Sequence, residues 1–200
     1  MTSADESLFN SANMVINGLK VFDEGLPEVQ SQLSYESVLP IAMWKSPQFG
    51  AVLFLRYSKD EDGAFTPAVT RAIFRREVEN WVPLKHWSGS GWSHNPLANP
   101  DSIKDLDDPP IQISGGSFRD QPPDNNPAIV INGRHSLGVK SISVTQNGVT
   151  QTSPANGRWG AWIVCLTAWE PYTIAALDDN GVELYLLRGP LQLPDVSQMN

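Results

Sequence analysis

The chain has little cysteine and little charge, and it lacks a long apolar run. Its 200 residues include a single cysteine, Cys165, which excludes an internal disulfide framework and makes a thiolate zinc site implausible. No window approaches the roughly 18 consecutive apolar residues of a membrane-spanning helix. The first residues are polar and acidic, unlike the basic start and apolar run of a secretory signal. We therefore expect a cytoplasmic protein without membrane insertion.

Charged residues make up only 18% of the chain, whereas glycine and proline number 15 and 16. Sparse charge with frequent chain-breaking residues favours short strands joined by many turns over long solvated helices. The formal net charge is −8, and an acidic surface repels phosphate. Nucleic acid and anionic membrane surfaces are therefore poor partners.

One amphipathic helix is predicted over residues 4–24. Ser3 and Glu6 match a capping box, and Gly25 followed by Pro27 is typical of a helix end. At about 100° per residue, the apolar side chains of the segment gather on one side: Leu8, Phe9, Ala12, Val15, Ile16, Leu19 and Phe22. This stripe needs a surface to cover.

The segment after this helix is predicted to form an antiparallel meander. An apolar run at 50–57 is too short for a typical helix and precedes a turn at 60–63. We predict two strands, 69–76 and 81–87, joined by a turn at 77–80. In a helix the apolar residues of this segment would be spread around the whole circumference and would form no single apolar face. Thr66-Pro67 resembles a helix start, so a helix over 68–82 is the alternative.

Residues 101–127 differ from the rest of the chain. They contain six aspartates against Lys104 and Arg119, together with several prolines. We interpret them as a long acidic, proline-rich connection with one short strand at 111–114. The predicted organisation is thus helix plus meander over 1–100, this connection, and a sandwich-like part over 128–200.

From residue 128 onward the pattern is that of a β structure. Apolar or β-branched runs predict strands at 128–132, 137–145, 160–168, 172–177 and 182–187. Turns are predicted at Asn132-Gly133, Asn147-Gly148, Asn156-Gly157 and 178–181. Asn-Gly pairs favour hairpin turns, and residues 178–181 also end in Asn-Gly. Residues 160–168 are apolar on both faces and are expected to form the central strand. The expected fold class is mainly β (α+β).

The C-terminal part also carries a motif set found in one family. Gly160 and Trp162 on a strand, the segment 171–176, and a hairpin from Asp178 to Gly181 resemble bacterial immunoglobulin-like β-sandwich modules. The resemblance covers residues 128–190, although two of the usual cysteines are missing. It implies a binding or spacer module rather than an enzyme.

Tryptophan is concentrated in a short segment around a Gly-Ser loop. Trp81, Trp87 and Trp92 lie close together with His86 and His94. Indole rings stack on sugars and apolar groups, and glycine lets a ligand approach the backbone. We therefore select these five residues as candidate contacts for a ligand or partner. The alternative is that the indoles cover the core of the meander and the glycines shape a turn.

Catalytic motifs are weak by comparison. Residues 88–91 read Ser-Gly-Ser-Gly, which does not match the nucleophile elbow. His86, His94 and His135 have no spacing typical of zinc ligands, and no cofactor or metal is expected. The primary hypothesis is a non-catalytic interaction protein that engages another protein. A carbohydrate-binding module that uses Trp87 and Trp92 is the alternative, and a hydrolase with dispersed Ser, His and Asp residues is third.

Overall fold

The computed structural model describes seven stretches of the chain: residues 3–27, 38–59, 62–91, 109–118, 129–155, 160–166 and 170–189. Over these stretches the chain forms α1 (Ser3–Glu24), β1 (Leu39–Lys45), β2 (Phe49–Lys59), β3 (Phe65–Glu77), β4 (Asn80–Gly91), β5 (Ile111–Phe118), β6 (Ile129–His135), β7 (Ser141–Gln146), β8 (Val149–Pro154), β9 (Ala161–Leu166), β10 (Tyr172–Leu177) and β11 (Glu183–Gly189). The predicted mainly β class is confirmed. No helix in these stretches has the length and apolar character needed to cross a membrane.

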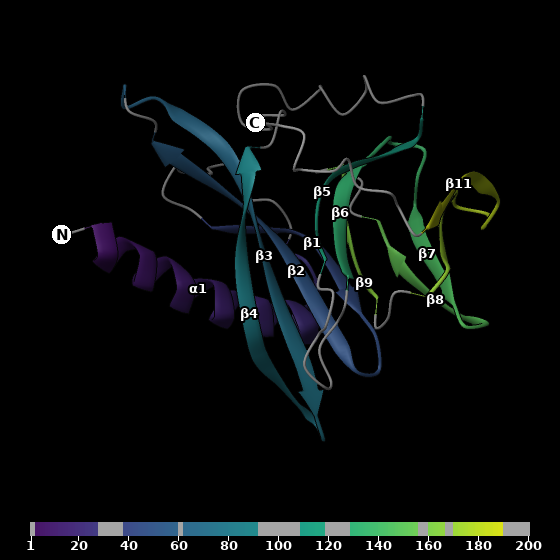
Figure 1. The fold of residues 1–200 in the computed structure, drawn as a ribbon, viewed down its shortest axis with the longest axis horizontal. Coiled ribbons are helices and arrows are strands. Elements are labelled where there is room, and N and C mark those ends of the chain that lie inside the picture. The colour runs from purple at the N-terminus through teal and green to yellow at the C-terminus, as the bar shows by residue number, and fades with distance from the viewer. Residues whose placement is uncertain are drawn as a thin grey trace.

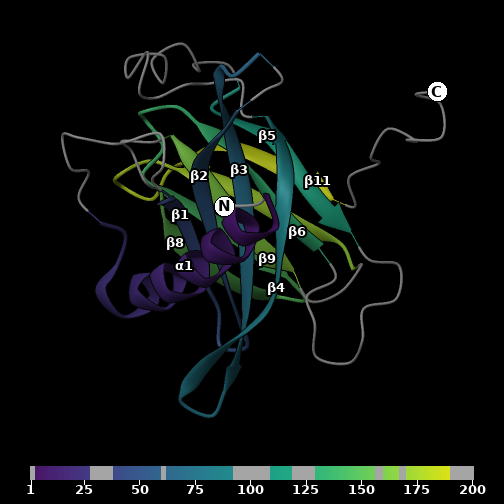
Figure 2. The same cartoon turned by 90° about the vertical axis from the view of Figure 1, so that its left-hand side faces the viewer.

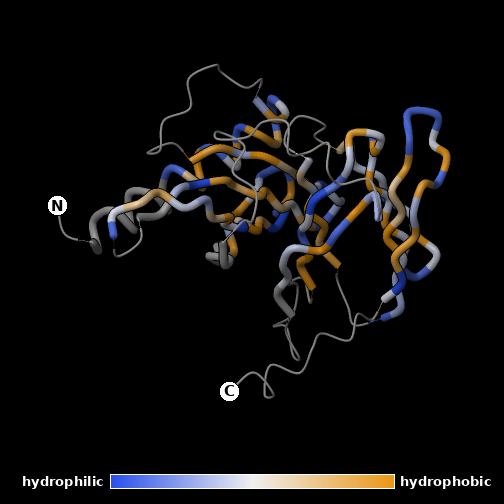
Figure 3. Tube along the Cα trace, turned by 90° about the horizontal axis from the view of Figure 1, so that it is seen from above, coloured by the Kyte–Doolittle hydropathy of each residue, from blue (hydrophilic) through white to orange (hydrophobic). Residues whose placement is uncertain are grey.

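The strands form three antiparallel sheets. The first has the order β1-β2-β3-β4, the second β5-β6-β9 and the third β11-β10-β7-β8. Helix α1 lies along one face of the first sheet, and strand β9 packs against β1 and β2 on the opposite face (Figure 1). Viewed from above, apolar residues follow the strands that lie between these layers (Figure 3).

The helix docks on the first sheet through aromatic rings that fit over glycines. Met14, Val21 and Phe22 are buried against Val52, Phe54, Ala72 and Phe74. A Cβ atom on Gly18 would lie 2.4 Å from Cζ of Phe74, and one on Gly50 would lie 2.4 Å from Cζ of Phe22. Each glycine therefore provides the space that the opposing ring fills.

The predicted helix limits agree with α1 to within one residue, but the buried face is rotated from the predicted stripe. Phe22 is buried, yet Ile16 is 53% exposed and Met14 takes a core position. The reason is the ring of Phe74, which is accommodated over Gly18. The predicted stripe was drawn from large apolar side chains alone. Gly18, which lies at the centre of the contact, was therefore not included in it.

The other face of the first sheet belongs to a larger core that includes residues of all three sheets. Its largest fully buried side chains are Ile41, Trp44, Leu53, Ile73, Ile111, Ile129, Ile131, Ile163, Leu166 and Ile174. Every residue of β9 is buried, as predicted from its unbroken apolar sequence. The predicted central place in the hydrogen-bonded order is wrong, because β6 lies between β5 and β9.

Residues 68–82 form strands rather than the alternative helix. β3 and β4 pair directly, with Glu77 opposite Asn80 across the turn. The turns at Asn147-Gly148 and 178–181 are also confirmed, with positive φ at Asn147, Gly148 and Gly181. The turns at 60–63 and at Asn156-Gly157 lie partly or wholly outside the described residues. Strands β1 and β8 were not predicted.

The predicted turn at Asn132-Gly133 is wrong, because both residues lie inside β6. Gly133 pairs with Ile113 on one side and with Trp162 on the other. A Cβ atom at Gly133 would lie 1.8 Å from the carbonyl oxygen of Gln112 and 2.8 Å from the Trp162 ring. Glycine is therefore used here for close approach between strands rather than for a reversal of the chain.

We predict that Gly133→Ala destabilises the protein by about 3 kcal/mol, because the added methyl group has no space between backbone and ring. The measurement is the free energy of unfolding from denaturant titration. Gly138→Ala is the matched control, since its Cβ would meet atoms no closer than 3.9 Å. Equal stability of the two variants would contradict the close approach at Gly133.

Candidate functional site

Trp81, one of the five predicted contact residues, packs against the helix. Its ring stacks on Phe22 with a centroid distance of 4.6 Å and an interplanar angle of 29°. The Lys45 ammonium and the Arg76 guanidinium lie 6.0 and 5.8 Å from the ring centroid. Trp81 is half-buried, so it covers the edge of the helix core and keeps part of its surface exposed.

Of the other predicted contact residues, the structure describes only the backbones of His86 and Trp87. The backbones of His86 and Trp87 lie in β4, opposite Ala72 and Arg71 of β3. Trp92 and His94 lie outside the described residues. A joint binding surface of Trp81, His86, Trp87, Trp92 and His94 therefore stays a prediction.

The tip of the β3–β4 hairpin has an unusual backbone. Val78 has a φ of 57° and is 94% exposed. The left-handed region is unfavourable for a β-branched residue, because the Cβ substituents crowd the backbone. The hairpin reaches beyond the neighbouring elements in two perpendicular views (Figures 1 and 2). An apolar side chain is thus presented in strained geometry at a protruding point.

Charges of both signs surround Val78. Arg75 and Glu77 form an ion pair on one side of the turn, while Arg76 and Glu79 are exposed. We define the hairpin tip as residues 75–81. Sequence analysis predicted the turn at 77–80 but could not identify Val78 as strained. The presence of a valine in a turn does not indicate that its φ is positive.

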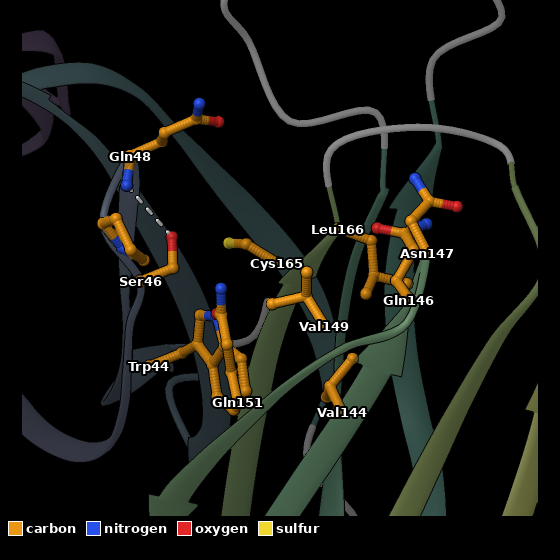
Figure 4. A pocket seen from close by; sticks show the side chains of 11 residues that line it. Trp44, Ser46, Gln48, Val144, Gln146, Asn147, Val149, Gln151, Cys165 and Leu166 are labelled. Carbon is orange, nitrogen blue, oxygen red and sulfur yellow. Dashed lines mark hydrogen bonds between the residues drawn. The ribbon is translucent and has the colours of Figure 1, made fainter.

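A pocket of about 280 Å³ lies where the β1–β2 turn meets the β7–β8 hairpin and the end of β9 (Figure 4). Its lining residues are Trp44, Ser46, Pro47, Gln48, Val144, Gln146, Asn147, Val149, Gln151, Cys165 and Leu166. Four of these side chains are carboxamides and none is charged. The pocket therefore suits a neutral ligand.

Trp44 forms part of the wall of this pocket. The residue is 1% exposed, and its indole Nε1 has no hydrogen-bond partner within the described part of the chain. A buried donor without a partner is costly, so this indole N–H is an unfavourable feature beside the pocket. Sequence analysis missed Trp44 because β1 was not predicted.

Cys165 and His135 are both buried side chains. Burial raises the pKa of the Cys165 thiol, because desolvation disfavours the thiolate. His135 is buried in β6, with Nδ1 2.8 Å from the carbonyl oxygen of Ser136. No group of three or more His, Cys, Asp or Glu residues there is placed to hold a metal ion.

No family model, curated protein or solved structure matches this chain. The resemblance of residues 128–190 to immunoglobulin-like modules therefore stays a prediction. The geometry of the chain itself is the basis for any functional proposal.

We predict that iodoacetamide alkylates Cys165 slowly at about pH 8. The rate in the native protein should be lower than the rate in the unfolded chain by about tenfold or more. The raised pKa keeps the native thiol protonated at a pH where an exposed thiol is partly ionised. Mass spectrometry of alkylation with and without denaturant provides the measurement. Equal rates in the two conditions would show that the thiol is not desolvated.

Proposed function

We propose that this protein is a non-catalytic binding protein and that it engages another protein through the hairpin tip. The observation that carries the proposal is Val78, an almost fully exposed valine with positive φ. Backbone strain of this kind costs about 1–3 kcal/mol and is concentrated at functional sites. The exposed side chain makes little compensating contact within the chain.

A partner could recover this cost by burying the valine. Full burial of a valine side chain contributes about 1.5–3 kcal/mol, which is comparable to the strain. The exposed part of Trp81 adds aromatic surface beside it, and aromatic residues dominate binding hot spots. Arg76, Glu77 and Glu79 give the tip charges of both signs, which favours a partner with complementary charges around an apolar pocket.

We predict that Val78→Asn abolishes partner capture while preserving the fold. Asparagine tolerates positive φ, so the melting temperature should stay equal or rise, whereas the apolar contact is lost. The measurement pairs thermal denaturation with crosslinked capture of partners from a lysate.

Val182→Asn is the matched control, because Val182 is an exposed valine near the β10–β11 turn. Capture by this variant should equal that of the wild type. If Val78→Asn captures the same proteins as the wild type, the hairpin tip is not the contact surface.

The pocket at Trp44 favours carbohydrate binding as a second candidate function. Four carboxamide side chains in an uncharged lining match the hydrogen bonding that sugars need. This location differs from the predicted one at Trp87 and Trp92. The observation that favours it is the uncharged lining of the pocket, which contains Gln48, Gln146, Asn147 and Gln151.

We predict that Trp44→Phe removes sugar binding, since the smaller ring changes the wall of the pocket, and that it lowers the stability by about 1–3 kcal/mol without unfolding the protein. The measurement is a titration with a panel of neutral monosaccharides, followed through indole N–H signals in NMR spectra. The Trp44 signal, assigned from its absence in the variant, should move in the wild type. A panel that leaves this signal unchanged would refute carbohydrate binding here.

A further inference from the structure

Strand β11 is an edge strand of the third sheet. In the order β11-β10-β7-β8 it pairs with β10, and no other strand of the described structure is bonded to it. Its seven residues, Glu183–Gly189, include neither proline nor lysine, which commonly protect strand edges from further pairing. In Figure 1, β11 lies at the opposite end of the molecule from α1. The outer backbone N–H and C=O groups of such a strand are a template for an added strand.

The opposite edge of the same sheet is β8, and it differs from β11. Strand β8 ends at Pro154, which cannot donate a backbone hydrogen bond to a neighbouring strand. The Oγ atom of Ser153 donates a hydrogen bond to the carbonyl oxygen of Met43 in β1, at 3.1 Å. This edge is therefore tied to the first sheet. Of the two edges of the third sheet, β11 is the one suited to pairing with another chain.

The side chains of β11 are mostly apolar on both faces. Tyr185 and Leu187 pack against the shared core, where they lie opposite buried residues of β10. Leu184 and Leu186 lie on the other face of the sheet. Leu184 is 41% exposed, and Leu186 is half-buried. A strand added beside β11 would cover apolar side chains as well as backbone groups.

The charges of β11 favour a second copy of the same strand as the partner. Glu183 lies at its start and Arg188 near its end, and both are exposed. Asp178 and Asp179 lie in the turn that precedes the strand. In an antiparallel pair of two copies, the acidic end of one strand lies beside Arg188 of the other. A parallel pair would bring like charges together, which is unfavourable.

We propose that two copies of this chain associate through β11, paired antiparallel about a two-fold axis at Leu186. Leu186 is the middle residue of β11, so this register gives all seven residues an opposite residue. It places Leu186 against Leu186 of the second copy, Tyr185 against Leu187, and Leu184 against Arg188. The two four-stranded sheets join into one continuous sheet. Because no residue of β11 lines the Trp44 pocket or belongs to the hairpin tip, this surface is separate from the sites described above.

The first test is sedimentation velocity of the full-length protein from about 5 to 500 µM, a range that detects micromolar dissociation constants. One strand pair is a small interface, and interfaces below about 1,200 Å² are typical of transient complexes. We therefore expect a reversible change from monomer to dimer across this range. A protein that stays monomeric at every concentration would overturn the proposal.

A charge exchange at Leu186 tests the location of the two-fold axis. Leu186→Lys places two ammonium groups opposite each other, and Leu186→Glu places two carboxylates there, so each variant alone should remain monomeric. An equimolar mixture of the two should form dimers, because each lysine then faces a glutamate. Dimers in the mixture also show that both variants are folded.

Thr150→Lys is the matched control for this charge exchange. Thr150 is exposed and lies on the same face of the sheet as Leu186, on the opposite edge strand. This variant should dimerise as the wild type does. Dimers of Leu186→Lys alone, or no dimers in the mixture, would show that association does not use this axis.

Cysteine crosslinking tests the register independently. Residues directly opposite in an antiparallel pair have Cα atoms about 4.5–5.5 Å apart, within the range that a disulfide spans. Leu186→Cys should therefore form an intermolecular disulfide on mild oxidation, seen by mass spectrometry without reduction. In Leu184→Cys the two cysteines would be four residues apart along the strands, about 13 Å, and should not crosslink. The native Cys165 is buried. Equal crosslinking of the two variants would refute the register.

Discussion

The burial of β9 on both faces is the contact that the rest of the structure depends on. Six consecutive residues, Ala161–Leu166, are all buried, although among the described strands β9 is hydrogen-bonded only to β6. Its two faces must therefore be covered by other elements. Strands β1 and β2 of the first sheet pack against it, so the N-terminal sheet and the C-terminal strands share one core.

This shared core also explains where unusual groups occur. Arg71 and Asn132, which have buried polar atoms without a partner among the described residues, come from different sheets and meet beside a bulge in β5. The Trp44 pocket likewise forms where strands from the first, second and third sheets end together. The hairpin tip lies away from these contacts. Polar atoms without hydrogen-bond partners are thus located where separate sheets meet. The apolar side chains there determine how the sheets pack, and the polar atoms do not.

Much of the fold could be predicted from the sequence, and the failures have physical causes. Helix α1 and the β3–β4 hairpin follow from capping residues, proline positions and short apolar runs. Strand β8 was missed because its side chains are mostly polar and exposed. Asn132-Gly133 was misread because partners on both sides, β5 and β9, outweigh the local preference for a turn. The candidate sites were not predictable, since the strain at Val78 and the lining of the Trp44 pocket are properties of the folded chain.

The rings that fit over glycines on the helix face also fix where the helix can sit along the sheet. Phe74 fills the space at Gly18, and Phe22 fills the space at Gly50. A shift of α1 by one turn, about 5.4 Å, would bring Met14 or Phe22 against Phe74 in place of Gly18. Both are large, so the shifted arrangement has no room for the ring. The helix therefore has one axial position on the sheet, which is set by the shape of these rings together with the hydrogen bond that Lys45 Nζ donates to the carbonyl oxygen of Phe22.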